Sequence, residues 1–269
     1  MSSGDRAVRV DVRGADELAA LARAFNVMAE GLDREERRKR ELTNDIAHEL
    51  RTPVTNLRCH LEALQDGVAP FTAGTARALH ADVVHLQRLV DDLGELAQVE
   101  ARELRLEPER TDLSTVVEHL ARELEPRLAS AGLTLERRTE GRVQAWVDPE
   151  RLRQVLRNLV ENAVAHTPAG GRIEIELTAD ESSASIGVSD TGEGIAAQHL
   201  PRVFDRFYRA DPARSRRTGG AGLGLAIARQ IVVQSGGDIA VVSEPGRSTT
   251  FTVRVPREAP SQLLHNSDV

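Results

Sequence analysis

The chain has 269 residues, of which 40% are hydrophobic and 29% charged, and its formal net charge is −7. This length indicates about two domains, and the sequence lacks both the apolar run of a membrane-spanning helix and the apolar core of a secretory signal. The acidic balance argues against nucleic acid as the main partner, and the single cysteine, Cys59, fits a reducing compartment, so we expect a cytoplasmic chain.

The amino-terminal part has the apolar spacing of long helices. Apolar residues recur at steps of three and four from Leu18 to Leu32, which predicts a parallel coiled coil. Similar spacing resumes from Leu42 to Leu64 and again from Leu79 to Leu96, with turn-forming residues between 66 and 74. This pattern predicts an antiparallel helical hairpin that buries one stripe per helix. Pairing with a second copy would complete a four-helix bundle, so we expect a homodimer.

From Thr111 onward, short strands alternate with helices. The helix starting at Asp148 has a strong start signal, an N-cap acid followed by proline and a second acid. The expected order is a helix at 112–131, strands at 133–138 and 144–148, a helix at 148–167, strands at 172–177 and 184–189, a helix at 222–235, and strands at 239–243 and 249–255. This order predicts an α/β sandwich with helices on one face of a mixed sheet.

A histidine on the first hairpin helix is the first chemical candidate. It occurs in the string DIAHELRTP, residues 45–53, where His48 lies beside the apolar seam but off its main line and should face solvent. Glu49 can orient the imidazole and accept its proton. Taken alone, a helical histidine is more often structural than catalytic.

Two asparagines on the 148–167 helix form the second candidate. Asn158 and Asn162 are one turn apart and share a helix face. An amide oxygen is a suitable ligand for Mg²⁺ that is held mainly by phosphates. Two asparagines on a helix carry little weight by themselves.

Two glycine-containing segments form the third candidate site. In the string DTGEGI, residues 190–195, glycines permit close backbone approach and Asp190 can accept from an adenine amino group, although a plain β-turn also explains such a string. The glycine run 219–224 opens onto a helix, whose free N–H groups suit phosphate, or it is a flexible loop. The string FDRFYR, residues 204–209, and arginines at 214, 216 and 217 lie between them, as part of a mobile lid or of a solvated loop.

In order and spacing across residues 41–255, these motifs resemble the sensor histidine kinases of bacterial two-component systems. The resemblance implies ATP-dependent autophosphorylation of His48 with assistance from Glu49, and phosphotransfer to an aspartate of a response regulator receiver domain. It also implies that Thr52 assists hydrolysis of the phosphorylated regulator. The family's basic residue after the second asparagine is replaced by Ala165, so the lid arginines are expected to supply that charge.

The resemblance further implies a site and a domain organisation. Mg²⁺ is expected on Asn162, and ATP is expected to contact Asn158, Asn162, His166, Asp190, Gly192, Gly194, Ile195, Phe204, Arg209, Gly220, Gly222, Leu223 and Gly224. The expected domains are a partial HAMP coiled coil at 1–36, a dimerisation and phosphotransfer hairpin at 37–102, a linker at 103–110, a GHKL-type ATP-binding domain at 111–257 and a disordered tail at 258–269. The full-length parent is expected in the inner membrane.

Two other classes of protein share some of these features. Gyrase-like and mismatch-repair ATPases have the same nucleotide-binding fold, but they place a glutamate one turn before the metal asparagine, where this chain has Asn158. An amide cannot activate water as a base, which favours a kinase. The third alternative, a non-catalytic dimeric scaffold, does not explain why His48, Glu49, Asn162 and Asp190 occur together.

Overall fold

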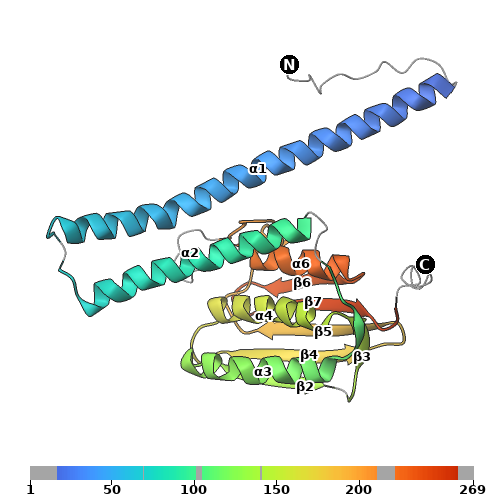
Figure 1. Cartoon of the computed structure of the whole chain (residues 1–269). Helices are drawn as coiled ribbons and strands as arrows, with labels where there is room; N and C mark the ends of the chain where they lie inside the picture. The colour runs from blue at the N-terminus through green and yellow to red at the C-terminus, as the bar shows by residue number, and fades with distance from the viewer. Residues whose placement is uncertain (1–16, 69, 101–104, 140, 211–221, 260–269) are drawn as a thin grey trace. The chain divides into compact units, whose positions relative to one another are not determined.

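The computed structural model describes residues 17–68, 70–100, 105–139, 141–210 and 222–259 (Figure 1). The chain divides into two compact units, Met1–Leu86 and Gln87–Val269. Helix α1 (Glu17–Gln65) runs without interruption through the charged stretch and through Pro53. Helix α2 (Ala73–Glu100) follows a short turn. None of the described helices combines the length and apolar composition that a membrane crossing requires.

The predicted helical hairpin is confirmed. The Thr75 amide N donates to Thr72 Oγ1 at 3.2 Å, so Thr72 supports the start of α2. His60 of α1 and Asp82 of α2 lie across from each other, with 3.3 Å between His60 Nδ1 and Asp82 Oδ2. The contact between His60 and Asp82 shows that the two helices pack side by side and antiparallel after the turn.

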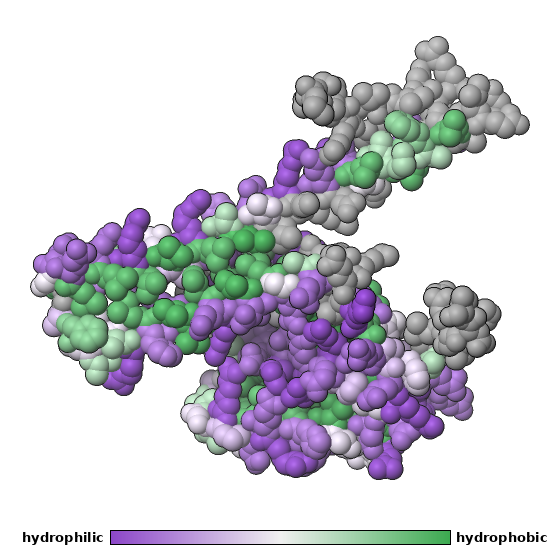
Figure 2. All heavy atoms as spheres, in the orientation of Figure 1, coloured by the Kyte–Doolittle hydropathy of each residue, from purple (hydrophilic) through white to green (hydrophobic). Residues whose placement is uncertain are grey.

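The helices carry large apolar side chains that one chain leaves uncovered. Those of the predicted heptad seam near the amino terminus are 40–66% exposed: Leu21, Phe25, Met28 and Leu32. Leu61 on α1 and Val83 on α2 are 51% and 44% exposed. Figure 2 shows hydrophobic residues gathered along the hairpin helices. Such a contiguous apolar surface is unusual for a monomer in water.

The second unit is an α/β sandwich built on a five-stranded sheet with strand order β2-β4-β5-β7-β6. Only β2 and β4 are parallel, and the other neighbours are antiparallel. A separate antiparallel pair joins β1 and β3. The elements are β1 (Glu109–Asp112), α3 (Leu113–Ser130), β2 (Thr134–Thr139), β3 (Gln144–Val147), α4 (Pro149–His166), β4 (Arg172–Ala179), β5 (Ser183–Asp190), η1 (Leu200–Arg202), α6 (Gly224–Gln234), β6 (Asp238–Glu244) and β7 (Ser248–Pro256).

Local sequence signals explain where the helices begin. The Asp112 carboxylate accepts from the Ser114 amide at 3.0 Å and caps α3. The Asp148 carboxylate accepts from the Glu150 and Arg151 amides at 3.0 and 3.1 Å and caps α4, with proline in the first turn. Both starts agree with the sequence expectation.

The core lies between the sheet and the helices α3, α4 and α6, which cover one of its faces (Figure 1). Alternate strand residues such as Ile175, Ile186 and Val253 are completely buried there. Helix α4 contributes one apolar stripe, formed by Leu152, Val155, Leu156, Leu159, Val160 and Ala163. The remaining face of α4, which includes Asn158 and Asn162, is only partly buried.

This packing generates a stability prediction. Leu156 is 0% exposed in the centre of the core, so Leu156→Ala should lower the free energy of unfolding by about 2–5 kcal/mol through lost burial and a residual cavity. The control Val233→Ala, on α6 with the valine 52% exposed, should change it by less than about 0.5 kcal/mol. The single tryptophan, Trp146 on β3, reports unfolding of this unit by fluorescence in denaturant titrations. Equal losses in the two variants would contradict the assigned core.

Candidate functional site

The candidate phosphoacceptor His48 lies on α1 with its side chain exposed, as the sequence predicted. Glu49 is partly buried beside it. Thr52 is exposed one turn further on, and its hydroxyl donates to the His48 carbonyl at 3.4 Å. An accessible imidazole next to a carboxylate meets the first requirement of a nucleophile paired with a base.

Helix α4 brings two of the predicted motifs together. The Asn158 side-chain Nδ2 donates to the Gly224 carbonyl at 3.0 Å, at the start of α6. A Cβ added at Gly224 would lie 3.5 Å from Asn158 Cγ, so the two elements are in contact. Asn158 therefore connects α4 to the glycine run.

Asn162, one turn further along α4, is partly exposed, and no hydrogen bond to its side chain is found among the described residues. Within the same residues, no group of three or more His, Cys, Asp or Glu side chains is placed to hold a metal ion. A divalent cation here would have to take most of its ligands from a phosphate group and from water. This is the coordination that Mg²⁺ prefers at nucleotide sites.

Asp190 is a nearly buried carboxylate at the end of β5, with 4% of its surface exposed. Its Oδ1 accepts from the Gly192 amide at 2.8 Å. Burial raises the pKa of Asp190 above its ordinary value, while the Gly192 N–H and the nearby His166 act in the opposite direction. A buried carboxylate at the end of a central strand is suited to accepting a hydrogen bond from a ligand.

Thr249 is a polar residue of this region that sequence reasoning missed. It is paired with Asp190 in the β5–β7 ladder and is 4% exposed. Its hydroxyl lies 2.9 Å from Ser243 Oγ. Thr249 occupies a position of β7 that alternation assigns to the core, two residues before the buried Phe251. The sequence signal for it was a threonine among the otherwise apolar residues at the buried, alternating positions of β7.

The loop after Asp190 passes through a narrow space where only glycine fits. A Cβ on Gly192 would lie 2.4 Å from the His166 carbonyl oxygen, and one on Gly194 would lie 2.2 Å from the Glu244 carbonyl oxygen. Gly194 also has a φ of +68°, which favours glycine. The Ile195 amide donates to Ser243 Oγ at 2.7 Å. The loop is thus held between the end of α4 and the β6–β7 hairpin.

His166, expected to contact nucleotide, is engaged by this loop. Its Nδ1 lies 2.9 Å from Glu193 Oε1, and its carbonyl accepts from the Glu193 amide at 3.3 Å. About 40% of each side chain is exposed. The sequence did not predict this pairing, because the two residues are 27 positions apart.

The lid string 204–209 contacts the glycine run and strand β7. The Phe207 amide donates to the Gly222 carbonyl at 3.0 Å, and both residues have positive φ, +57° and +72°. Phe204 packs edge-on against Phe251, with ring centroids 6.0 Å apart. Arg209 is partly buried, and its Nε has no hydrogen-bond partner among the described residues.

The remaining predicted site residues are Leu223, Gly220 and the lid arginines. Leu223 is completely buried, so its side chain belongs to the core. Gly220 and the arginines at 214, 216 and 217 lie outside the described residues.

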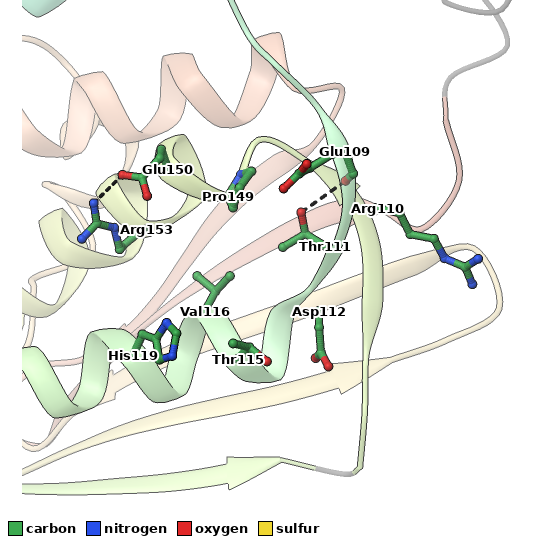
Figure 3. A pocket seen from close by; sticks show the side chains of 10 residues that line it. All are labelled: Glu109, Arg110, Thr111, Asp112, Thr115, Val116, His119, Pro149, Glu150 and Arg153. Atoms are coloured by element: carbon green, nitrogen blue, oxygen red, sulfur yellow. Dashed lines mark hydrogen bonds and ion pairs between the residues drawn. The ribbon is translucent and has the colours of Figure 1, made fainter.

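A cavity of ≈ 310 Å³ lies elsewhere in the second unit (Figure 3). It is lined by Glu109, Arg110, Thr111, Asp112, Thr115, Val116, His119, Pro149, Glu150 and Arg153. The residues from α4 are in its first two turns, whereas Asn162 and His166 are in its last two. At 1.5 Å per residue, Arg153 and Asn162 are about 13 Å apart along the helix axis. This cavity is therefore distinct from the candidate site, and the sequence predicted none of its residues as functional.

Comparison with known proteins agrees with this arrangement. Residues 147–259 match the family of "Histidine kinase-, DNA gyrase B-, and HSP90-like ATPase", residues 38–102 match the "His Kinase A (phospho-acceptor) domain", and residues 1–34 match the "HAMP domain". The signal transduction histidine-protein kinase BaeS of Escherichia coli (strain K12) is 36% identical over 258 residues, which are 96% of this chain and 55% of BaeS.

Solved structures show the same relationship. The Acinetobacter baumannii histidine kinase AdeS is 31% identical, with a TM-score of 0.67 over 79% of this chain and 98% of that chain. Full-length ShkA in complex with AMPPNP is 28% identical, with a TM-score of 0.60 over 82% of this chain and 47% of that chain. The chain belongs to the sensor histidine kinase family. It spans about half the length of the curated relatives it matches.

The opposite environments of two aspartates generate a prediction for the protein without ligand. Because burial favours protonated Asp190 in the folded state, the folded state loses stability as pH rises above about 4, the ordinary carboxyl pKa. Asp190→Asn removes this loss. Its melting temperature should exceed that of the wild type at pH 7, and the difference should disappear below pH 4.

Asp180 provides the control of opposite sign. Hydrogen bonds from Ser183 and Ser182 hold the pKa of this exposed carboxyl well below its ordinary value. Its contribution to stability is present above about pH 4 and is lost as pH falls, so Asp180→Asn should lower the melting temperature at pH 7. Calorimetric scans between pH 3 and 7 that showed the same sign for both variants would contradict these assignments.

Proposed function

We propose that this chain binds Mg-ATP between α4, the loop after β5 and the start of α6, and transfers the γ-phosphoryl group to His48. The main support for this proposal is that three sequence motifs meet at α4: its own asparagines, the glycine run and the loop after Asp190. Asn158 is bonded to the glycine run at Gly224, and His166 is bonded to the Asp190 loop at Glu193. Asn162 lies on α4 between these two contacts. ShkA, a structural neighbour, was solved in complex with AMPPNP, which supports a nucleotide as the ligand of this chain.

Each residue has a chemical role that its surroundings fit. Asp190 accepts a hydrogen bond from the adenine amino group, and Arg209, whose Nε lacks a partner among the described residues, offers charge to the phosphates. The Asn162 side chain would hold Mg²⁺, which offsets phosphate charge when bound. A ring nitrogen of His48 attacks the γ-phosphorus in line, the bond to the ADP oxygen breaks, and Glu49 accepts the proton from the other ring nitrogen.

ATP hydrolysis as the primary activity is the competing proposal. It requires a base where this chain has Asn158, and that amide is committed to the Gly224 carbonyl. The kinase proposal also accounts for the exposed His48 on α1, which a hydrolase would not need.

We further propose that phospho-His48 passes its phosphoryl group to a response regulator aspartate. The match of residues 38–102 to the phosphoacceptor family supports this step. Thr52, exposed one turn beyond His48, would orient water during hydrolysis of the phosphorylated regulator. The HAMP match and the half-length coverage of relatives support a larger, membrane-anchored sensor whose cytoplasmic part contains this segment.

The direct test is incubation with γ-labelled ATP. Wild-type protein should acquire acid-labile label, and His48→Ala should acquire none while binding Mg-ATP with wild-type affinity in calorimetry. The control Asn162→Ala should lose both label and affinity. Release of free phosphate without protein label would favour a hydrolase, and neither product would favour a scaffold. Acid-labile label persisting in His48→Ala would contradict the assignment of this histidine.

The exposed apolar side chains of α1 and α2 support a homodimer. Burying roughly ten Leu or Val side chains at about 1.5–3 kcal/mol each exceeds the cost of association. Light scattering at micromolar concentration should give twice the chain mass of 29.4 kDa. Leu61→Glu, at a seam position that is 51% exposed in the single chain, should shift the protein towards monomer. A wild-type mass of one chain would contradict the proposal.

A further inference from the structure

The hydrogen bond between the His166 and Glu193 side chains connects the last turn of α4 to the loop that carries Asp190. His166 Nδ1 and Glu193 Oε1 are 2.9 Å apart. On the other side of the loop, the Glu193 carbonyl accepts from the Gly246 amide at 2.6 Å. Glu193 therefore lies between the end of α4 and the β6–β7 hairpin and contacts both.

We infer that His166 and Glu193 are positioning residues that lock the adenine-reading loop against the metal-binding helix. The inference rests on the proposed nucleotide site and goes beyond it, because His166 acts through Glu193 and not by direct contact with ATP. Asn162 is on the same helix, one turn before His166, and Asp190 is three residues before Glu193. The pair fixes the distance between the groups that hold the two ends of one nucleotide.

Both members of the pair also act on Asp190. Charge on His166 and charge on Glu193 act on the Asp190 carboxyl in opposite directions. The contact between the two side chains thus holds the loop directly beside the buried carboxylate. The backbones of His166 and Gly192 are too close to admit any side chain at 192, so the loop lies directly against the end of α4.

A direct contact between His166 and nucleotide predicts a different outcome, and the sign of the Glu193 effect separates the two. If Glu193 were a bystander near an anionic ligand, Glu193→Ala would remove a repulsive charge and strengthen ATP binding. If Glu193 is part of the lock, the same change weakens binding, because the loop loses its orientation.

A double-mutant cycle on the full chain tests the inference. His166→Ala and Glu193→Ala should each raise the dissociation constant for Mg-ATP about two- to fivefold, the range expected for a partly exposed contact between two polar side chains. The double variant should bind Mg-ATP no more weakly than the weaker-binding single variant, because either substitution alone already removes the shared contact. In autophosphorylation, the KM for ATP should rise with the dissociation constant, while kcat at saturating ATP stays within about twofold of wild type.

The matched control is the exposed ion pair between Glu118 and Arg137, 2.8 Å apart on α3 and β2. Glu118→Ala should leave the affinity for ATP unchanged. Additive effects of the two lock substitutions, or tighter binding by Glu193→Ala, would overturn the inference. Wild-type protein that bound no Mg-ATP would instead overturn the proposed function, so the two failures are distinguishable.

Discussion

The packing of α4 against the sheet is the interaction on which the candidate site depends. Six apolar residues of α4 are buried in one stripe, which fixes the rotation of the helix about its axis. Asn158, Asn162 and His166 then follow one another at four-residue spacing off that stripe. Two of them contact different segments, Asn158 the start of α6 at Gly224 and His166 the loop after β5 at Glu193. A helix with any other rotation would separate the motifs.

The same sheet buries two polar residues at positions where apolar residues would make the fold more stable. Asp190 and Thr249 are paired at inward positions of β5 and β7, in rows otherwise filled by residues such as Val188 and Phe251. Burying a carboxylate costs free energy unless its hydrogen bonds are satisfied. Here one oxygen is held by the Gly192 amide. Local departures from the apolar pattern are expected at functional sites, where they are offset by the surrounding fold.

Much of the fold was predictable because its signals are local. The caps at Asp112 and Asp148 and the alternation of β4 and β5 gave helix and strand positions that agree with the structure to within two residues. Asp190 and the two asparagines were identified as candidates for the same reason, because each lies in a short recognisable string.

The remaining features depend on contacts between residues distant in sequence. Spacing says nothing about the partner of His166, which is set by where the β5 loop crosses the end of α4. Phe207 has a positive φ, which is unusual for a bulky residue, and its amide donates to the distant Gly222, so residue preferences do not predict this conformation. The parallel pairing of β2 with β4 is likewise a property of the assembled sheet.

The central claim is that one nucleotide–metal complex binds across α4, the Asp190 loop and the start of α6. Paramagnetic broadening by Mn²⁺, substituted for Mg²⁺ in complex with AMPPNP, locates the metal directly in amide spectra of the deuterated protein. The account predicts broadening centred on Asn162 and extending to Gly192 and Gly224. Broadening centred on the amides of Glu150–Arg153, beside the cavity in Figure 3, would contradict it.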